Sequence, residues 1–268
     1  MDILRAVLTL GIMGGIFALL LGIASQIFKV EINPKEKEVL EALPGINCGA
    51  CGYVGCEACA KAIVNGEAHI TACKVGGQEV SDNIAKIMGV NSEISIKEVS
   101  FVACNGGCNA KDRYEFAGTK DCRVTSETLG GVKECRFACQ GGGNCVDVCE
   151  YDAIHIINGV AVVDPDKCTA CAKCIKACPK NLISLRLYND YAGVACSNKD
   201  FGKAVSSVCT KGCIGCGLCA KLAPKSFELN GKLAFYKNSE NADIEKIKMA
   251  AEKCPTGAIL LNNEKINA

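Results

Sequence analysis

"CTACAKCIKACP", residues 168–179, places four cysteines within eleven positions and follows the last one with a proline. The steps between these thiols are three, three and four residues. Thiolate ligands of one inorganic centre need such short steps, whereas a disulfide framework does not require them. The stretch therefore indicates metal ligation, and we expect the fold around it to be organised by metal centres.

The rest of the chain is also rich in cysteine. Its 268 residues include 22 cysteines but only eight phenylalanines, six tyrosines and no tryptophan. Such a cysteine content is otherwise expected in short secreted chains held by disulfides. Because a core with so few aromatic side chains is thin, we expect bound metal to hold much of this fold together.

The quoted stretch matches the C-x2-C-x2-C-x3-C-P run of bacterial ferredoxins, in which the fourth cysteine binds the other of two 4Fe–4S clusters. A second run precedes it, with wider spacing and with Glu150 in place of the proline. Crossing the two runs predicts one cluster on Cys135, Cys139, Cys145 and Cys178. It predicts a second cluster, close to the first, on Cys149, Cys168, Cys171 and Cys174.

Three further groups of cysteines flank these runs. A carboxyl-terminal run has Ala223 where its next cysteine would stand, so we expect a single cluster on Cys213, Cys216, Cys219 and Cys254. The stretch "NCGACGYVGC" and a later thiol predict a cluster on Cys48, Cys51, Cys56 and Cys73, with Cys59 as a spare small hydrophobic residue. The remaining thiols predict a fifth cluster, on Cys104, Cys108 and Cys122 with either Cys196 or Cys209.

Zinc is the alternative that these spacings leave open, because four-cysteine zinc sites also use C-x2-C steps. Zinc suits the isolated amino-terminal group tolerably, but a tetrahedral ion has no use for two interlocked runs. A zinc-stabilised scaffold without a redox role is therefore the rival hypothesis.

The amino terminus carries an uncharged apolar run over residues 6–27. As a helix it would be about 33 Å long, enough to cross a hydrocarbon core of about 30 Å. Lysines follow the run, which favours a cytoplasmic carboxyl side. We expect a single-pass helix in the cytoplasmic (inner) membrane, with the remaining domains facing the cytoplasm; a cleaved signal peptide is the alternative. Small residues on one helix face are typical of packing against a partner helix in lipid: Gly11, Gly15, Ala18 and Gly22.

We expect an α+β fold, in which the transmembrane helix is followed by small iron–sulfur modules, including ferredoxin-like domains of βαβ type that contain hairpins. Asn158-Gly159 and Asn230-Gly231 predict two hairpins, because Asn-Gly supplies the two positive-φ positions of a tight turn. The stretch that begins at Val80 is expected to form a helix followed by a strand over 94–102, and a further helix is expected over residues 242–254. The predicted domains are 1–28 (transmembrane helix), 29–90 (membrane-proximal 4Fe–4S domain), 91–132 (linker region with the "CNGGC" motif), 133–190 (two-cluster ferredoxin-like domain) and 191–268 (single-cluster ferredoxin-like domain).

The charges are unevenly distributed. Residues 167–225 contain ten basic and two acidic side chains, whereas residues 29–90 contain six basic and eight acidic ones. Part of this positive charge offsets anionic clusters, and the rest would attract an acidic redox partner. No dinucleotide-binding motif, paired carboxylates or nucleophile–base pair is present, so we expect neither a dinucleotide fold nor a substrate pocket on this chain. Nucleic acid is not among the expected partners. His69 and His155 are expected at the surface.

The order of the motifs resembles one family. An apolar helix, then "LPGINCGACGYVGC", "CNGGC" and the ferredoxin runs, is similar to the B subunit of the Rnf complex, a membrane ferredoxin:NAD+ oxidoreductase that couples electron flow to Na+ or H+ transport. The resemblance implies an electron-transfer subunit of this translocase, with reduced ferredoxin and the membrane subunits as partners and with flavin and NAD sites on other subunits. The module from Cys196 onward resembles the cluster-rich forms of anaerobes. A polyferredoxin-type subunit of a hydrogenase or quinone reductase is the alternative.

Overall fold

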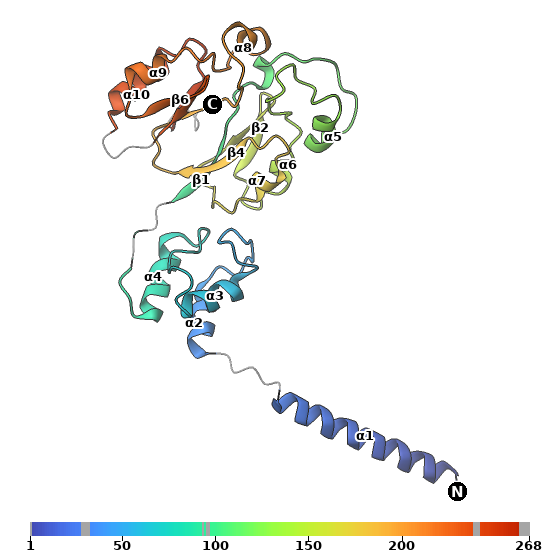
Figure 1. Cartoon of the computed structure of the whole chain (residues 1–268). Helices are drawn as coiled ribbons and strands as arrows, with labels where there is room; N and C mark the ends of the chain where they lie inside the picture. Colours follow the sequence, from blue (N-terminus) through green and yellow to red (C-terminus); the bar gives the residue numbers. More distant parts are fainter. Residues whose placement is uncertain (1, 28–32, 93, 95–96, 238–241, 263–268) are drawn as a thin grey trace.

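Three hydrophobic cores divide the part of the chain that carries the cysteines. The computed structural model describes residues 2–27, 33–92, 94, 97–237 and 242–262. One core is helical and belongs to residues 39–88, the second to residues 99–188, and the third to residues 192–261. Figure 1 shows these parts following the first helix in chain order. The mixture of helices and strands agrees with the predicted α+β class.

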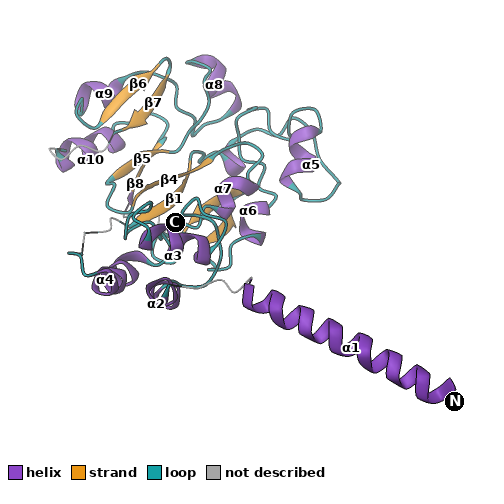
Figure 2. Cartoon of the chain, turned by 60° about the horizontal axis from the view of Figure 1, so that its bottom comes forward, coloured by secondary structure: helices purple, strands orange, loops and turns teal. Residues whose placement is uncertain are grey.

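Helix α1 (Asp2–Ile27) is one continuous helix of 26 residues. The large apolar side chains described on it remain exposed, from 49% at Ile23 to 69% at Leu21. Figures 1 and 2 show it standing away from the rest of the chain. Among the residues that the structure describes, however, no helix is both long enough and apolar enough to cross a membrane. The transmembrane assignment therefore stays a prediction.

Three helices build the first core: α2 (Pro34–Ala42), α3 (Cys56–Val64) and α4 (Gly77–Met88). Helix α2 begins where Asn33 accepts a hydrogen bond from the Lys35 backbone N–H at 3.0 Å, with a proline at the first helical position. Helix α4, which overlaps the helix predicted in the stretch from Val80 onward, ends at Met88, and its cap is Gly89, whose φ of 71° suits a glycine. The apolar faces of the three helices meet at Val39, Ile63 and Ile84.

Short elements joined by long loops build the second core. They are β1 (Glu98–Val102), the 3-10 turn η1 (Gly107–Asn109), α5 (Cys122–Glu127), α6 (Asn144–Asp147), β2 (Ile154–Ile157), β3 (Val160–Val163), α7 (Lys173–Ala177) and β4 (Ile183–Leu187). Strand β1 comes from the segment predicted as a linker region and pairs with β4, with Ser100 opposite Leu185. This pairing ties residues 98–102 to the ferredoxin-like part of the chain.

The third core repeats this plan on a smaller scale. Its elements are β5 (Ala192–Val194), α8 (Lys203–Val208), α9 (Leu218–Leu222), β6 (Phe227–Asn230), β7 (Leu233–Tyr236), α10 (Ile244–Glu252) and β8 (Ile259–Leu261). The predicted carboxyl-terminal helix is α10, which begins where the Asp243 side chain accepts a hydrogen bond from the Lys246 N–H. Strand β5 pairs with β8, so the end of the described chain closes this module.

Both predicted hairpins are present, one of them with a shifted turn. Strands β2 and β3 join through Asn158 and Gly159, both at positive φ, as predicted. Strands β6 and β7 instead join through Gly231 and Lys232, and only Gly231 has a positive φ. Glycine at the first position of a two-residue loop permits a type II′ turn, which needs a positive φ only there. Asn230 is therefore the last residue of β6.

The predicted βαβ character is wrong for the part of the chain described. All four strand pairs, β1–β4, β2–β3, β5–β8 and β6–β7, are antiparallel. A parallel pair needs a crossover of about a dozen residues, usually a helix. The segments between these strands are short turns or cysteine-bearing loops, and the helices in those loops are mostly only four to six residues long. The strand predicted over 94–102 begins at Glu98, and residues 95–96 lie outside the described range.

Candidate metal centres

The amino-terminal thiols lie in the loops that flank α3. The structure brings together the four predicted residues, here named the Cys56 group: Cys48, Cys51, Cys56 and Cys73. Burial raises the pKa of Cys73, and the three neighbouring thiols raise it further. Asn47 holds the first loop against α3, because its Oδ1 accepts a hydrogen bond from the Cys56 N–H at 2.8 Å. The fifth thiol, Cys59, is 1% exposed and packs in the helical core.

The carboxyl-terminal thiols also lie together as predicted. One pocket is lined by the Cys219 group: Cys213, Cys216, Cys219 and Cys254. Burial raises the pKa of Cys219 to about 11, and the other three thiols add to the rise. Cys216 is exposed at this group, whereas Cys219 is buried. The loop around Cys216 therefore opens toward solvent.

A third predicted set meets beside β1. This is the Cys174 group: Cys149, Cys168, Cys171 and Cys174. Burial raises the pKa of Cys174, and the other three thiols raise it further. A hydrogen bond from Ser100 acts in the opposite direction and lowers it. Backbone N–H groups point at the sulfurs: that of Ser100 donates to Cys168 Sγ, and that of Ala153 donates to Cys149 Sγ, both at 3.4 Å.

The other crossed set differs from the prediction in one member. The pocket beside α6 is lined by the Cys145 group: Cys122, Cys139, Cys145 and Cys178. Cys122 takes the place predicted for Cys135, because Asn144 fastens α5 to this loop. The Asn144 Oδ1 accepts a hydrogen bond from the Cys122 N–H at 2.6 Å, and its Nδ2 donates to Asp121 at 3.0 Å.

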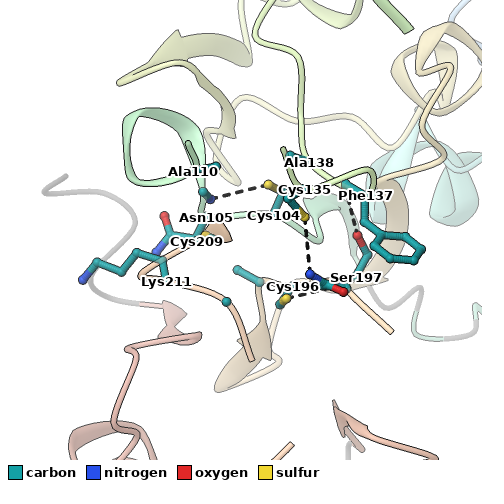
Figure 3. A pocket seen from close by; sticks show the side chains of 14 residues that line it. Cys104, Asn105, Ala110, Cys135, Phe137, Ala138, Cys196, Ser197, Cys209 and Lys211 are labelled. Carbon is teal, nitrogen blue, oxygen red and sulfur yellow. Dashed lines mark hydrogen bonds between the residues drawn. The ribbon is translucent and has the colours of Figure 1, made fainter. Parts of the chain in front are cut away.

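Cys135 belongs to a different pocket. That pocket is lined by the Cys104 group: Cys104, Cys135, Cys196 and Cys209. Figure 3 shows these labelled side chains reaching one hollow from separate stretches of the chain. Cys196 and Cys209, the two alternatives for the fourth ligand of the predicted fifth cluster, both line this pocket. Burial raises the pKa of Cys104 to about 11. An isolated bridge between Ala110 and Cys209 brings the carboxyl-terminal segment alongside the "CNGGC" loop.

Cys108, predicted as a ligand of the fifth cluster, is exposed and lines none of these pockets. The 3-10 turn at Gly107–Asn109 explains its position. The Cys108 N–H donates to the Asn158 carbonyl at 2.7 Å, which holds this residue against the β2–β3 turn. Gly107, at φ +46°, lies so close to that turn that a Cβ would fall 2.1 Å from the Asn158 oxygen. The five groups of four account for 20 of the 22 cysteines, and the two that belong to no group are Cys59 and Cys108.

The remaining features are disulfides, the two histidines and sites for a single metal ion. All 22 cysteines lie in described residues, and none of them forms a disulfide. His69 and His155 are exposed, as expected, and His155 lies on β2 with its Nε2 3.6 Å from Asp152. Among the same residues, no three or more histidines, cysteines or carboxylates are arranged to hold a single metal ion.

The donors of the five groups fit 4Fe–4S clusters. A cluster is a larger body than a single ion, and its ligands are four thiolates that approach from different sides. Backbone N–H groups that donate to thiolate sulfurs are a recurrent second shell of such clusters. The Cys104 group has three of them within 3.5 Å, from Gly106 and Cys139 to Cys104 and from Asn198 to Cys196. The burial that raises these thiol pKa values disfavours thiolates unless positive iron neutralises them.

Neighbouring groups form a row. Burial raises the pKa of Cys196, and the Cys213 N–H, which donates toward this thiol, counters the rise. This contact joins the Cys219 and Cys104 groups. The Cys139 N–H donates to Cys104 Sγ at 3.4 Å, which joins the Cys104 and Cys145 groups. Helix α7 then carries Cys174 and is followed directly by Cys178, which joins the Cys145 and Cys174 groups.

Tyr151 lies at the last step of the row. Burial raises the pKa of this tyrosine, and the thiols of Cys171 and Cys48 raise it further. One thiol of the Cys174 group and one of the Cys56 group thus lie within electrostatic reach of Tyr151. The resulting order runs from the Cys219 group through the Cys104, Cys145 and Cys174 groups to the Cys56 group.

Three known domain families match the chain at these groups. Residues 43–75 match a family described as a putative Fe–S cluster, residues 138–182 match the 4Fe–4S dicluster domain, and residues 209–261 match the 4Fe–4S single cluster domain of ferredoxin I. The fold and the thiol groups thus define an iron–sulfur protein with several 4Fe–4S clusters, built from ferredoxin-type domains.

Curated relatives place it more narrowly. The chain is 44% identical over 206 residues to the B subunit of the Na(+)-translocating ferredoxin:NAD(+) oxidoreductase complex of Acetobacterium woodii. This match spans 76% of this chain and 62% of the length of that protein. It is 38% identical to the B subunit of the ion-translocating oxidoreductase complex of Methanosarcina acetivorans, over 83% of this chain and 85% of that protein. It is 36% identical to the proton-translocating counterpart of Clostridium ljungdahlii, over 96% and 92%. The chain belongs to the family of B subunits of the Rnf ion-translocating oxidoreductase complex.

Proposed function

We propose that this chain carries electrons from reduced ferredoxin to the membrane subunits of an ion-translocating ferredoxin:NAD+ oxidoreductase. The observation that carries the proposal is the row of five thiol groups. It runs from the Cys219 group, in which Cys216 is exposed, to the Cys56 group, which is nearest α1 in the sequence. When bound, 4Fe–4S clusters supply reversible one-electron chemistry. Flavin and NAD+ sites are proposed to lie on other subunits, as the resemblance implies.

The chain's own residues hold the groups at close range. Crossed loops make each ferredoxin-like segment supply ligands to a neighbouring group, so the spacing between groups is part of the fold. The thiols of the Cys145 group are mostly buried, with Cys139, Cys145 and Cys122 below 10% exposure. Exclusion of water from these positions lowers the solvent reorganisation that accompanies a change of charge.

We place the docking surface for ferredoxin beside Cys216. A Cβ at Gly215 would fall 2.4 Å from the Lys232 carbonyl oxygen and 3.0 Å from the Phe201 ring, so these two residues lie beside the Cys216 loop. The Lys232 ammonium lies 4.4 Å from the centroid of that ring. Phe201 is 52% exposed and Lys232 is also exposed. An apolar side chain and a basic one thus flank the exposed thiol, in a region with the excess of positive charge noted above. Such a surface complements an acidic electron carrier.

Reversing one charge on this surface tests it. In a Lys232→Glu variant, the rate at which reduced ferredoxin transfers electrons to the purified chain should fall about tenfold at low ionic strength, because electrostatic steering of the encounter is lost. The difference should shrink as salt is added, since exposed charges are screened. Anaerobic stopped-flow measurement of ferredoxin oxidation gives the rate.

Lys61→Glu, on an exposed position of α3, is the matched control and should keep the parent rate. Equal rates in parent and Lys232→Glu would move the docking surface elsewhere. A parent chain that holds clusters but does not oxidise ferredoxin would reject the proposed function itself.

We further propose that α1 anchors the chain in the membrane beside the other Rnf subunits, with the cysteine-bearing domains on the cytoplasmic side. The exposed apolar side chains along α1 support this, since so much exposed apolar surface marks a membrane or protein contact. The small residues Gly11, Gly15 and Gly22, around which a Cβ would meet nothing within 4 Å, leave room for a partner helix. Recovery of the full chain in the soluble fraction after alkaline washing of membranes would reject the anchor.

A further inference from the structure

Two buried polar residues outside the cysteine motifs each contact two thiols of one group. Ser100, on β1, is 4% exposed, and Asn198, after β5, is 2% exposed. Each uses its backbone N–H for one sulfur and its side chain for another. Neither residue belongs to a cysteine run.

Ser100 faces the Cys174 group. Its N–H donates to Cys168 Sγ at 3.4 Å, and its hydroxyl oxygen lies 3.3 Å from Cys174 Sγ. A cysteine that binds iron is a thiolate and has no proton to give, so the hydroxyl is the donor in the loaded protein. Pairing with Leu185 across the β1–β4 sheet fixes the backbone of Ser100. The hydroxyl is therefore held toward the sulfur by the strand itself.

Asn198 faces the Cys104 group in the same way. Its N–H donates to Cys196 Sγ and its side-chain Nδ2 donates to Cys135 Sγ, both at 3.5 Å. The orientation of the amide is fixed, because its Oδ1 accepts a hydrogen bond from the Asp200 N–H at 2.8 Å. The NH2 end must then point at Cys135. One residue thus links two thiols that come from different ferredoxin-like segments.

We propose that Ser100 and Asn198 set the reduction potentials of the clusters on the Cys174 and Cys104 groups. The inference rests on the proposed function, since it requires clusters on these thiols. Reduction adds one electron to a cluster, from an external reductant, and makes or breaks no bond to the protein. A hydrogen bond to a ligand sulfur stabilises the more negative, reduced form and raises the potential. Each residue then makes its own cluster easier to reduce than it would otherwise be.

The test removes one donor at a time in the full-length, cluster-loaded chain. Ser100→Ala should lower the midpoint potential of one EPR signal, and Asn198→Ala should lower that of a different one, in anaerobic titrations with dithionite. Iron content should stay at the parent value in both variants. Ser100→Thr keeps a hydroxyl and should restore the parent potential. Ser207→Ala removes an exposed hydroxyl that donates to the Ala204 carbonyl and should change no potential.

The two variants control each other, because general loosening of the protein would shift the same signals in both. Full iron content with unchanged potentials would overturn the inference and leave the proposed function intact. Loss of iron from Ser100→Ala that Ser100→Thr does not reverse would also overturn it, since the residue would then serve packing alone. A parent chain without reducible clusters would instead reject the proposed function.

Discussion

A Cys135→Ala/Cys178→Ala double variant is expected to lose about eight iron atoms per chain, as the two thiols belong to different groups and each 4Fe–4S cluster holds four irons. A Cys122→Ala/Cys178→Ala double variant is expected to lose only about four, because both thiols line the pocket beside α6. Iron analysis of anaerobically purified protein measures both losses against the unaltered chain.

The pairing of runs expected from the sequence alone gives the opposite order, since it places Cys135 and Cys178 on one cluster and Cys122 on another. A larger loss from the Cys122 double variant would therefore contradict the grouping described above. Cys108→Ala serves as the control and should keep the full iron content, because this thiol is exposed and lies outside all five groups.

Gly107→Ala is expected to lower the free energy of unfolding by about 3 kcal/mol, the upper range for overpacking against a rigid neighbour. Its Cβ would fall 2.1 Å from the Asn158 carbonyl oxygen, which belongs to the backbone of the β2–β3 turn and cannot rotate away. Anaerobic denaturant unfolding, followed by the visible absorbance of the clusters, measures the change.

Gly130→Ala is the matched control for this substitution. Gly130 also has a positive φ, +80°, but a Cβ there would meet nothing within 4 Å. Only the cost of the left-handed conformation remains, about 1–2 kcal/mol. Equal effects of the two substitutions would show that the close contact with the hairpin turn does not matter, and the account of why Cys108 faces outward would lose its support.

Much of this fold could be predicted from local spacing. Short cysteine steps identify the Cys56, Cys174 and Cys219 groups, because most of their ligands come from one loop whose geometry the sequence sets. The Asn158-Gly159 turn was also predictable, since its two residues alone supply the required φ values. The second hairpin shifted by one residue because glycine at the first loop position admits a different turn.

The regrouping of Cys122 and Cys135 could not be predicted from spacing. Cys122 reaches α6 through the Asn144 side chain, and an asparagine carries no signal of such a contact in the sequence. The Cys104 group joins residues from both ferredoxin-like segments, which only tertiary packing brings together. The same holds for Ser100, which lies far from the cysteine run that it contacts. The one local hint was the irregular spacing of the first run, from Cys135 to Cys149.

Anaerobic analysis of iron and acid-labile sulfide in the full chain tests the central claim most directly. Five groups of four thiols predict about twenty atoms of each per chain. A folded chain that contains zinc in place of iron, or that joins these thiols to one another as disulfides, would contradict the account.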